Sequence, residues 1–170
     1  MNNDAKHLIF ADVNGERYQD AKDSESVAEK LTVLKRAEHI FFIADGGLLI
    51  KNQEKHAVKK DVTNMISRCI QSNLITPEKK VNLIVTKWDL ITSGGKIEEV
   101  TNFFINPIME KFAANLAKVI KVASRSLNDD VPSRSGIDEF LIECLKRPSA
   151  EIIEPIPDLV RQYQMVKFQR

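Results

Sequence analysis

Four short runs along the chain are almost continuously apolar and have the length of buried strands. They cover residues 7–11, 39–44, 81–86 and 119–123, and each is rich in Val, Ile, Leu or Phe. A strand in a parallel sheet is covered on both faces, so its sequence reads as an apolar run and not as an alternation. The pattern therefore predicts four strands of a mainly parallel sheet.

Between these runs the apolar residues recur at helical spacing. Residues 26–36, 57–74, 97–116 and 136–145 carry apolar side chains three or four positions apart, as expected of helices with one buried face. Pro107 is expected to kink or break the third helix. Strands that alternate with helices are joined by right-handed crossovers, so we predict an α/β fold, a three-layer sandwich with a mainly parallel sheet.

The pattern divides the chain into one domain and a tail. Residues 1–147 are predicted to form the α/β domain. Residues 148–170 contain three prolines and are predicted to form a C-terminal tail that packs on the domain or on a partner. Within it, residues 158–168 have apolar positions spaced for a short helix.

Composition changes this picture little. Hydrophobic residues make up 43% of the 170 residues and charged residues 29%, which is enough apolar material for one core. The net charge of +1 gives no basic field, so no nucleic-acid partner is expected. The apolar runs are too short for a membrane span, and no signal peptide is recognisable. Cys69 and Cys144 have no metal or redox spacing, so we predict reduced core thiols in a cytoplasmic protein.

Acidic residues follow three of the four apolar runs. Asp12 comes after the first run, Asp45 after the second and Asp89 after the third. In an open parallel sheet, ligands bind beyond the carboxyl ends of the strands, where these residues are expected. Asp45 precedes Gly46 and Gly47, and we interpret it as a turn residue rather than a ligand.

The third strand end carries the most specific chemistry. Residues 86–89 read Thr-Lys-Trp-Asp, directly follow an apolar run and are expected to lead into a loop. The Asp89 carboxylate can accept both the ring N–H and the exocyclic amino group of guanine, a pair of donors that adenine lacks. The aliphatic stem of Lys87 can lie against the flat face of the base while its ammonium stays solvated.

This strand end resembles the N/T-K-x-D guanine motif of the translation-factor-related (TRAFAC) class of P-loop GTPases, which includes Ras-like proteins. The resemblance implies that Thr86, Lys87 and Asp89 bind guanine. Ser124 and Arg125, in an Ala-Ser-Arg string after the fourth run, are similar to the Ser-Ala-Lys/Arg motif of that class. There the backbone N–H of the middle residue meets the guanine oxygen, so Ser124 takes that role and Arg125 flanks the base.

The end of the first run, Asp-Val-Asn-Gly, resembles the D-x-x-G switch motif of the same class. The resemblance places Asp12 near a magnesium-bound water and the Gly15 N–H near a γ-phosphate, so GTP or GDP and Mg²⁺ are the implied cofactors. Glu16 stands where Ras-like enzymes commonly have a water-orienting Gln; an ionised Glu cannot donate the same hydrogen bond, so hydrolysis by that route is not expected. The string from Asp12 to Tyr18 also resembles the bacterial double-GTPase subfamily.

The phosphate-binding motif of the class, G-x-x-x-x-G-K-[ST], occurs nowhere in the 170 residues. The nearest string, Gly94, Gly95 and Lys96, has Leu90 in the first glycine position and Ile97 in the hydroxyl position. In the family this loop follows a strand that precedes the switch motif, so we expect the chain to lack the N-terminal phosphate-loop portion. That portion supplies most of the grip on the phosphates, and a lone guanine pocket should bind GTP weakly.

A missing central strand would leave two apolar edges in the sheet. The first and second runs can pair directly, a protein partner or a missing N-terminal segment can complete the sheet, or the sequence is a fragment of a longer gene. The leading functional hypothesis is a guanine-nucleotide-binding protein of the GTPase family that acts as a switch in a larger assembly. The alternatives are a pseudo-GTPase interaction module without nucleotide, and an unrelated α/β enzyme that uses Asp12 and Asp45 around magnesium.

Overall fold

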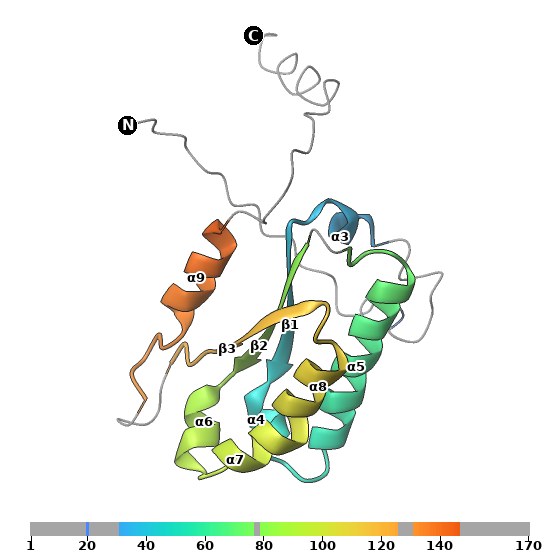
Figure 1. The fold of residues 1–170 in the computed structure, drawn as a ribbon. Helices are drawn as coiled ribbons and strands as arrows, with labels where there is room; N and C mark the ends of the chain where they lie inside the picture. The colour runs from blue at the N-terminus through green and yellow to red at the C-terminus, as the bar shows by residue number, and fades with distance from the viewer. Residues whose placement is uncertain (1–19, 21–30, 77–78, 126–130, 147–170) are drawn as a thin grey trace, which may run out of the picture.

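The computed structural model describes residues 20, 31–76, 79–125 and 131–146 (Figure 1). Within these ranges it is an α/β fold built on three parallel strands in the spatial order β1-β2-β3, namely β1 (His39–Asp45), β2 (Lys80–Thr86) and β3 (Leu116–Lys121). The predicted α/β fold with a parallel sheet is confirmed. The strand predicted at residues 7–11, the domain boundary at residue 147 and the helix predicted at residues 158–168 lie outside the described residues.

β2 is the central strand, and its side chains from Val81 to Val85 are all buried. It pairs with β1 in the register His39↔Lys80 through Asp45↔Thr86, so both strands end side by side. The mostly apolar sequence of β2, in which Asn82 is also buried, therefore reflects cover on both faces of this central strand.

Helices fill most of the connections between the strands, and all except α5 are short. In chain order they are α3 (Thr32–Arg36), α4 (Gly46–Leu49), α5 (Lys55–Gln71), α6 (Trp88–Ser93), α7 (Ile97–Val100), the π-helix η1 (Thr101–Ile105), α8 (Asn106–Lys111) and α9 (Ile137–Leu145). Figure 1 places α5 and α8 on one side of the sheet and α9 on the other, so the sheet is the middle layer. The helices predicted at residues 57–74 and 136–145 correspond to α5 and α9.

The helix predicted at residues 97–116 forms as α7, η1 and α8 but ends at Lys111, five residues early. Pro107 lies in the first turn of α8 and has no N–H to donate to Phe103, four residues back. The π-helical turn before it accommodates the proline, with the Asn106 N–H donating to the carbonyl of Thr101. The Phe103 carbonyl accepts instead from the ammonium of Lys59 on α5, at 2.7 Å.

The fourth predicted strand, residues 119–123, is displaced in the structure. β3 starts at Leu116, and Ala123 forms only an isolated antiparallel bridge with Ser135. β3 has a strand neighbour on one side only among the described elements, and its residues are a mixture of buried, half-buried and exposed positions. The exposed Ala117 and the half-buried Lys118 precede the apolar run, which is why the predicted strand started late.

The hydrophobic core lies between the sheet and the helices α5 to α8. Its largest fully buried side chains include Leu49, Met65, Ile66, Leu74, Leu83, Ile91, Phe104 and Ile108. Both cysteines, Cys69 and Cys144, are free and buried, as predicted. No helix in the described part of the chain is long and apolar enough to cross a membrane.

The face of the sheet under α9 is less completely covered. Phe41 of β1 packs edge-to-face on Phe140 of α9, with ring centroids 5.0 Å apart. Two residues further along β1, the Ile43 side chain is 64% exposed, whereas Phe42 on the opposite face is 5% exposed. The two faces of β1 therefore make very different contributions to the core.

Candidate functional site

The ends of β1 and β2 lie next to each other, and each runs almost directly into a short helix. Asp45 pairs with Thr86 in the sheet register, α4 follows β1 at once, and a single residue, Lys87, separates β2 from α6. The expectation that residues 86–89 lead into a loop was wrong. Lys87 has a φ of 52°, in the left-handed region, and this conformation turns the chain from strand to helix within one residue.

Asp45 links these two strand ends through one carboxylate. Its Oδ2 lies 2.7 Å from the Nζ of Lys87, and its Oδ1 accepts a 2.8 Å hydrogen bond from the Gly47 N–H. Asp45 is thus the N-cap of α4 rather than a turn residue. Partial burial would raise the pKa of Asp45, but the hydrogen bonds from Lys87 and Gly47 outweigh it and lower that pKa, so the carboxylate is ionised at neutral pH.

The two glycines after Asp45 let α4 approach the end of β2 closely. A Cβ atom on Gly46 would lie 2.2 Å from the carbonyl oxygen of Thr86, and one on Gly47 would lie 3.2 Å from Cδ of Lys87. The Thr86 hydroxyl donates to the Ala44 carbonyl at 3.3 Å, which further joins the two strand ends. Glycine is needed at position 46 because the neighbouring atom belongs to the backbone.

Asp89 lies in the first turn of α6 and is buried, with 4% of its surface exposed. A carboxylate in this position interacts favourably with the positive end of the helix. Lys87, two residues earlier, has a side chain that is 54% exposed. Of the two residues predicted to contact a base, Lys87 is therefore at the surface and Asp89 is buried.

Ser124 and Arg125 are exposed and follow β3. The chain just before them is attached to the β2–α6 junction, because the Trp88 N–H donates to the Val122 carbonyl at 3.1 Å. The Ala123 N–H in turn donates to the Ser135 carbonyl at 3.0 Å. The structure therefore brings the two predicted guanine-binding segments to the same edge of the sheet.

Sequence reasoning missed two contacts of this edge. One is the ion pair between Asp45 and Lys87, which joins residues 42 positions apart. The other is the ammonium of Lys121, which lies 4.5 Å from the centroid of the Trp88 ring, a cation–π arrangement. The available signal for the first was that Asp45 and Thr86 both end strands of one parallel sheet.

The predicted switch residues Asp12, Gly15 and Glu16 lie outside the described residues. Their assignment to phosphate, magnesium and hydrolysis stays a prediction. Among the residues that the structure does describe, no group of three or more His, Cys, Asp or Glu side chains could hold a metal ion.

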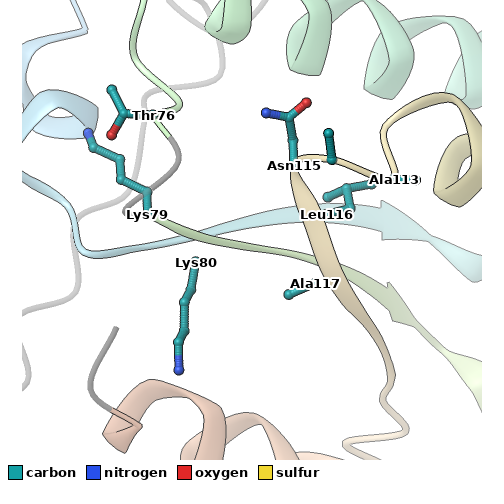
Figure 2. Close-up of a pocket in the computed structure, with 8 residues that line it drawn as sticks. Thr76, Lys79, Lys80, Ala113, Asn115, Leu116 and Ala117 are labelled. Carbon is teal, nitrogen blue, oxygen red and sulfur yellow. The ribbon is translucent and has the colours of Figure 1, made fainter. Parts of the chain in front are cut away.

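A hollow of about 300 Å³ lies at the opposite end of the sheet, where β2 and β3 begin (Figure 2). It is lined by Lys79, Lys80 and Asn115, among others, and Figure 2 shows the two lysines pointing to opposite sides of the strand. The ammonium of Lys79 donates to the carbonyls of Leu34 and Lys35 at the end of α3. This hollow does not coincide with the predicted site, which lies at the other end of the strands.

Comparison with known proteins gives one family. Residues 1–145 match the model of the family described as Double-GTPase 2. No match was found among curated proteins or among solved structures.

Proposed function

The chain belongs to the Double-GTPase 2 family, and from this we propose that it binds a guanine nucleotide, GTP or GDP, as a switch component of a larger assembly. Thr86, Lys87 and Asp89 bind one edge and one face of the base, and Ser124 and Arg125 close the other side. Asp12 and Gly15 serve the phosphate and magnesium end of the nucleotide.

The observation that carries this proposal is the 3.1 Å hydrogen bond from the Trp88 N–H to the Val122 carbonyl. It holds the segment with Lys87 and Asp89 beside the segment with Ser124. A base-recognition site needs hydrogen-bond donors and acceptors from both segments within reach of one ring. The backbone hydrogen bond between the two segments keeps them close enough for this.

Recognition of the phosphates is proposed to come from elsewhere. The 170 residues contain no phosphate-loop motif, so a protein partner or a segment outside this sequence would supply the backbone N–H groups and the lysine that hold the β- and γ-phosphates. Without them the site recognises the base alone. We expect a dissociation constant on the order of 0.1–1 mM and no appreciable hydrolysis of GTP by this chain alone.

Titration of the isotope-labelled protein by NMR tests the proposal. Guanosine, GDP and GTP should shift the amide signals of Lys87 and Ser124 with similar affinities, because the base provides most of the binding energy, whereas ADP should not. Asp89→Ala should abolish these shifts, and Glu110→Ala, at an exposed position of α8, serves as a control. Equal shifts with ADP and GDP, or none with any guanine compound, would reject the proposal.

A pseudo-GTPase interaction module is the second candidate. Its support is the burial of Asp89 together with apolar side chains at the surface, since Ile43 is 64% and Ile142 is 55% exposed. This candidate predicts a protein that binds no nucleotide but recruits a specific partner through these residues. A stable monomer with neither nucleotide binding nor a partner in pull-down experiments would count against it.

A further inference from the structure

The end of β1 and the start of α4 together hold the side chain of Lys87. The Asp45 carboxylate lies 2.7 Å from the Lys87 ammonium, and Gly47 leaves room for the lysine stem, whose Cδ is 3.2 Å from the position of a Cβ on that glycine. The same carboxylate is fixed by the Gly47 N–H, and its pKa is lowered, so the negative charge is both oriented and persistent.

The backbone of Lys87 alone does not determine where its long side chain points. A lysine stem has four rotatable bonds, and holding it in one geometry costs conformational entropy. The strand-to-helix turn sets the left-handed backbone at Lys87. The position of the side chain can therefore be fixed by another residue that binds its ammonium. Asp45, on the neighbouring strand, is the group that holds it.

We propose that Asp45 is a positioning residue for base recognition, and that its carboxylate directs the Lys87 stem along α4 so that the stem's free side forms one wall of the guanine site. This inference rests on the proposed function. It assigns to the Asp-Gly-Gly string at the end of β1 a role that neither the family match nor the guanine motif includes. The ligand class is a guanine base, and Asp45 acts on it only through Lys87.

The charge-removing variant Asp45→Asn tests this, because Asn is as good an N-cap as Asp and should keep α4 intact. Guanosine affinity, measured by NMR titration, should fall about threefold, the size expected of one partly exposed ion pair. Asp45→Ser, which also caps helices, should give the same loss. Glu54→Gln is the matched control, since Glu54 forms an exposed ion pair with Lys51 at 3.5 Å that includes no motif residue, and its affinity should be unchanged.

A double-mutant cycle separates positioning from a merely structural role. Lys87→Met keeps an unbranched apolar stem but has no ammonium, so adding Asp45→Asn to it should change the guanosine affinity less than about 1.5-fold. As a second measurement, the rate at which an amine-acylating reagent labels Lys87, followed by mass spectrometry, should rise in Asp45→Asn without ligand and stay unchanged in Glu54→Gln.

The outcomes are distinguishable. A threefold loss that disappears in the Lys87→Met background, with faster labelling of Lys87, supports the inference. No loss, or an equal loss in both backgrounds, overturns the inference while the proposed function stands. If the wild-type protein binds no guanine compound, the proposed function fails first, and the inference falls with it because there is then no base for Lys87 to contact.

Discussion

Replacing Gly46 with alanine is expected to push α4 away from the end of β2 and to weaken both the fold and the candidate site. The new Cβ would lie 2.2 Å from the carbonyl oxygen of Thr86 and 2.9 Å from Cδ1 of Ile91. The Ile91 methyl group can rotate away. The Thr86 oxygen cannot, because it belongs to the backbone of a strand that is paired on both sides.

The structure sets the size of the effect. Cβ atoms essentially never approach a neighbour closer than 3.0 Å, so helix and strand must separate by at least 0.8 Å, the difference between 3.0 and 2.2 Å. Overpacking of this kind costs about 1–3 kcal/mol, and a backbone obstacle places Gly46→Ala in the upper half of that range. For a domain of this size, a loss of about 2 kcal/mol lowers Tm by about 4–8 °C.

Thermal and urea unfolding followed by circular dichroism measure this loss, and NMR titration with guanosine measures the effect on the site. Gly95→Ala is the matched control, because no atom lies within 4 Å of its Cβ position and only its φ of +63° opposes alanine. It should cost about 1 kcal/mol through backbone strain and leave guanosine affinity unchanged. A Gly46→Ala protein that melts within about 1 °C of the wild type would refute the close packing of α4 on β2.

Three further predictions concern the core and two ionisable groups, one at the surface and one buried. Phe42→Ala should lower the free energy of unfolding by about 3–5 kcal/mol, and Ile43→Ala by less than about 1 kcal/mol, because their side chains are 5% and 64% exposed; similar losses in urea unfolding would contradict the assignment of the two faces of β1. Hydrogen bonds from two lysines, of which Lys96 has the larger effect, lower the pKa of Glu99 from 4.5 to about 2. The stability that Glu99 contributes should therefore be present above about pH 4.5 and be lost as the pH falls towards 2, and an NMR titration should show its midpoint moving upward in Lys96→Met. Burial raises the pKa of Cys69 to about 12, so a thiol reagent at about pH 8 should label it only after unfolding; rapid labelling of the native protein would show that the core is open there.

The sequence was sufficient to predict β1, β2 and the longest helix. β1 and β2 read as mostly apolar runs, β2 with the single polar interruption Asn82, and the 17 residues of α5 carry a clear helical pattern. α4 has four residues and α6 has six, too few for a period of 3.6 to be recognised. β3 was displaced in the prediction because the exposed Ala117 and the half-buried Lys118 interrupt its apolar sequence, so the run begins only at Val119.

Contacts between residues on different strands could not be predicted without knowing which strands are neighbours. The guanine motif was found because its residues are adjacent in the sequence. The partner of Lys87 was not found, because Asp45 is 42 residues away and faces it only once β1 and β2 pair in the observed register. The burial of Asp89 also depends on tertiary packing, since nothing in its local sequence distinguishes a buried from an exposed carboxylate.

The central claim, recognition of guanine by Asp89, is tested most directly by changing the base that the site prefers. Xanthine keeps the ring N–H of guanine but has a carbonyl in place of the exocyclic amino group. An Asn side chain can accept from the first group and donate to the second, whereas a carboxylate can only accept. In NMR titrations with guanosine and xanthosine, the wild-type protein should prefer guanosine and Asp89→Asn should prefer xanthosine, each by about tenfold. An unchanged preference in Asp89→Asn would contradict the account.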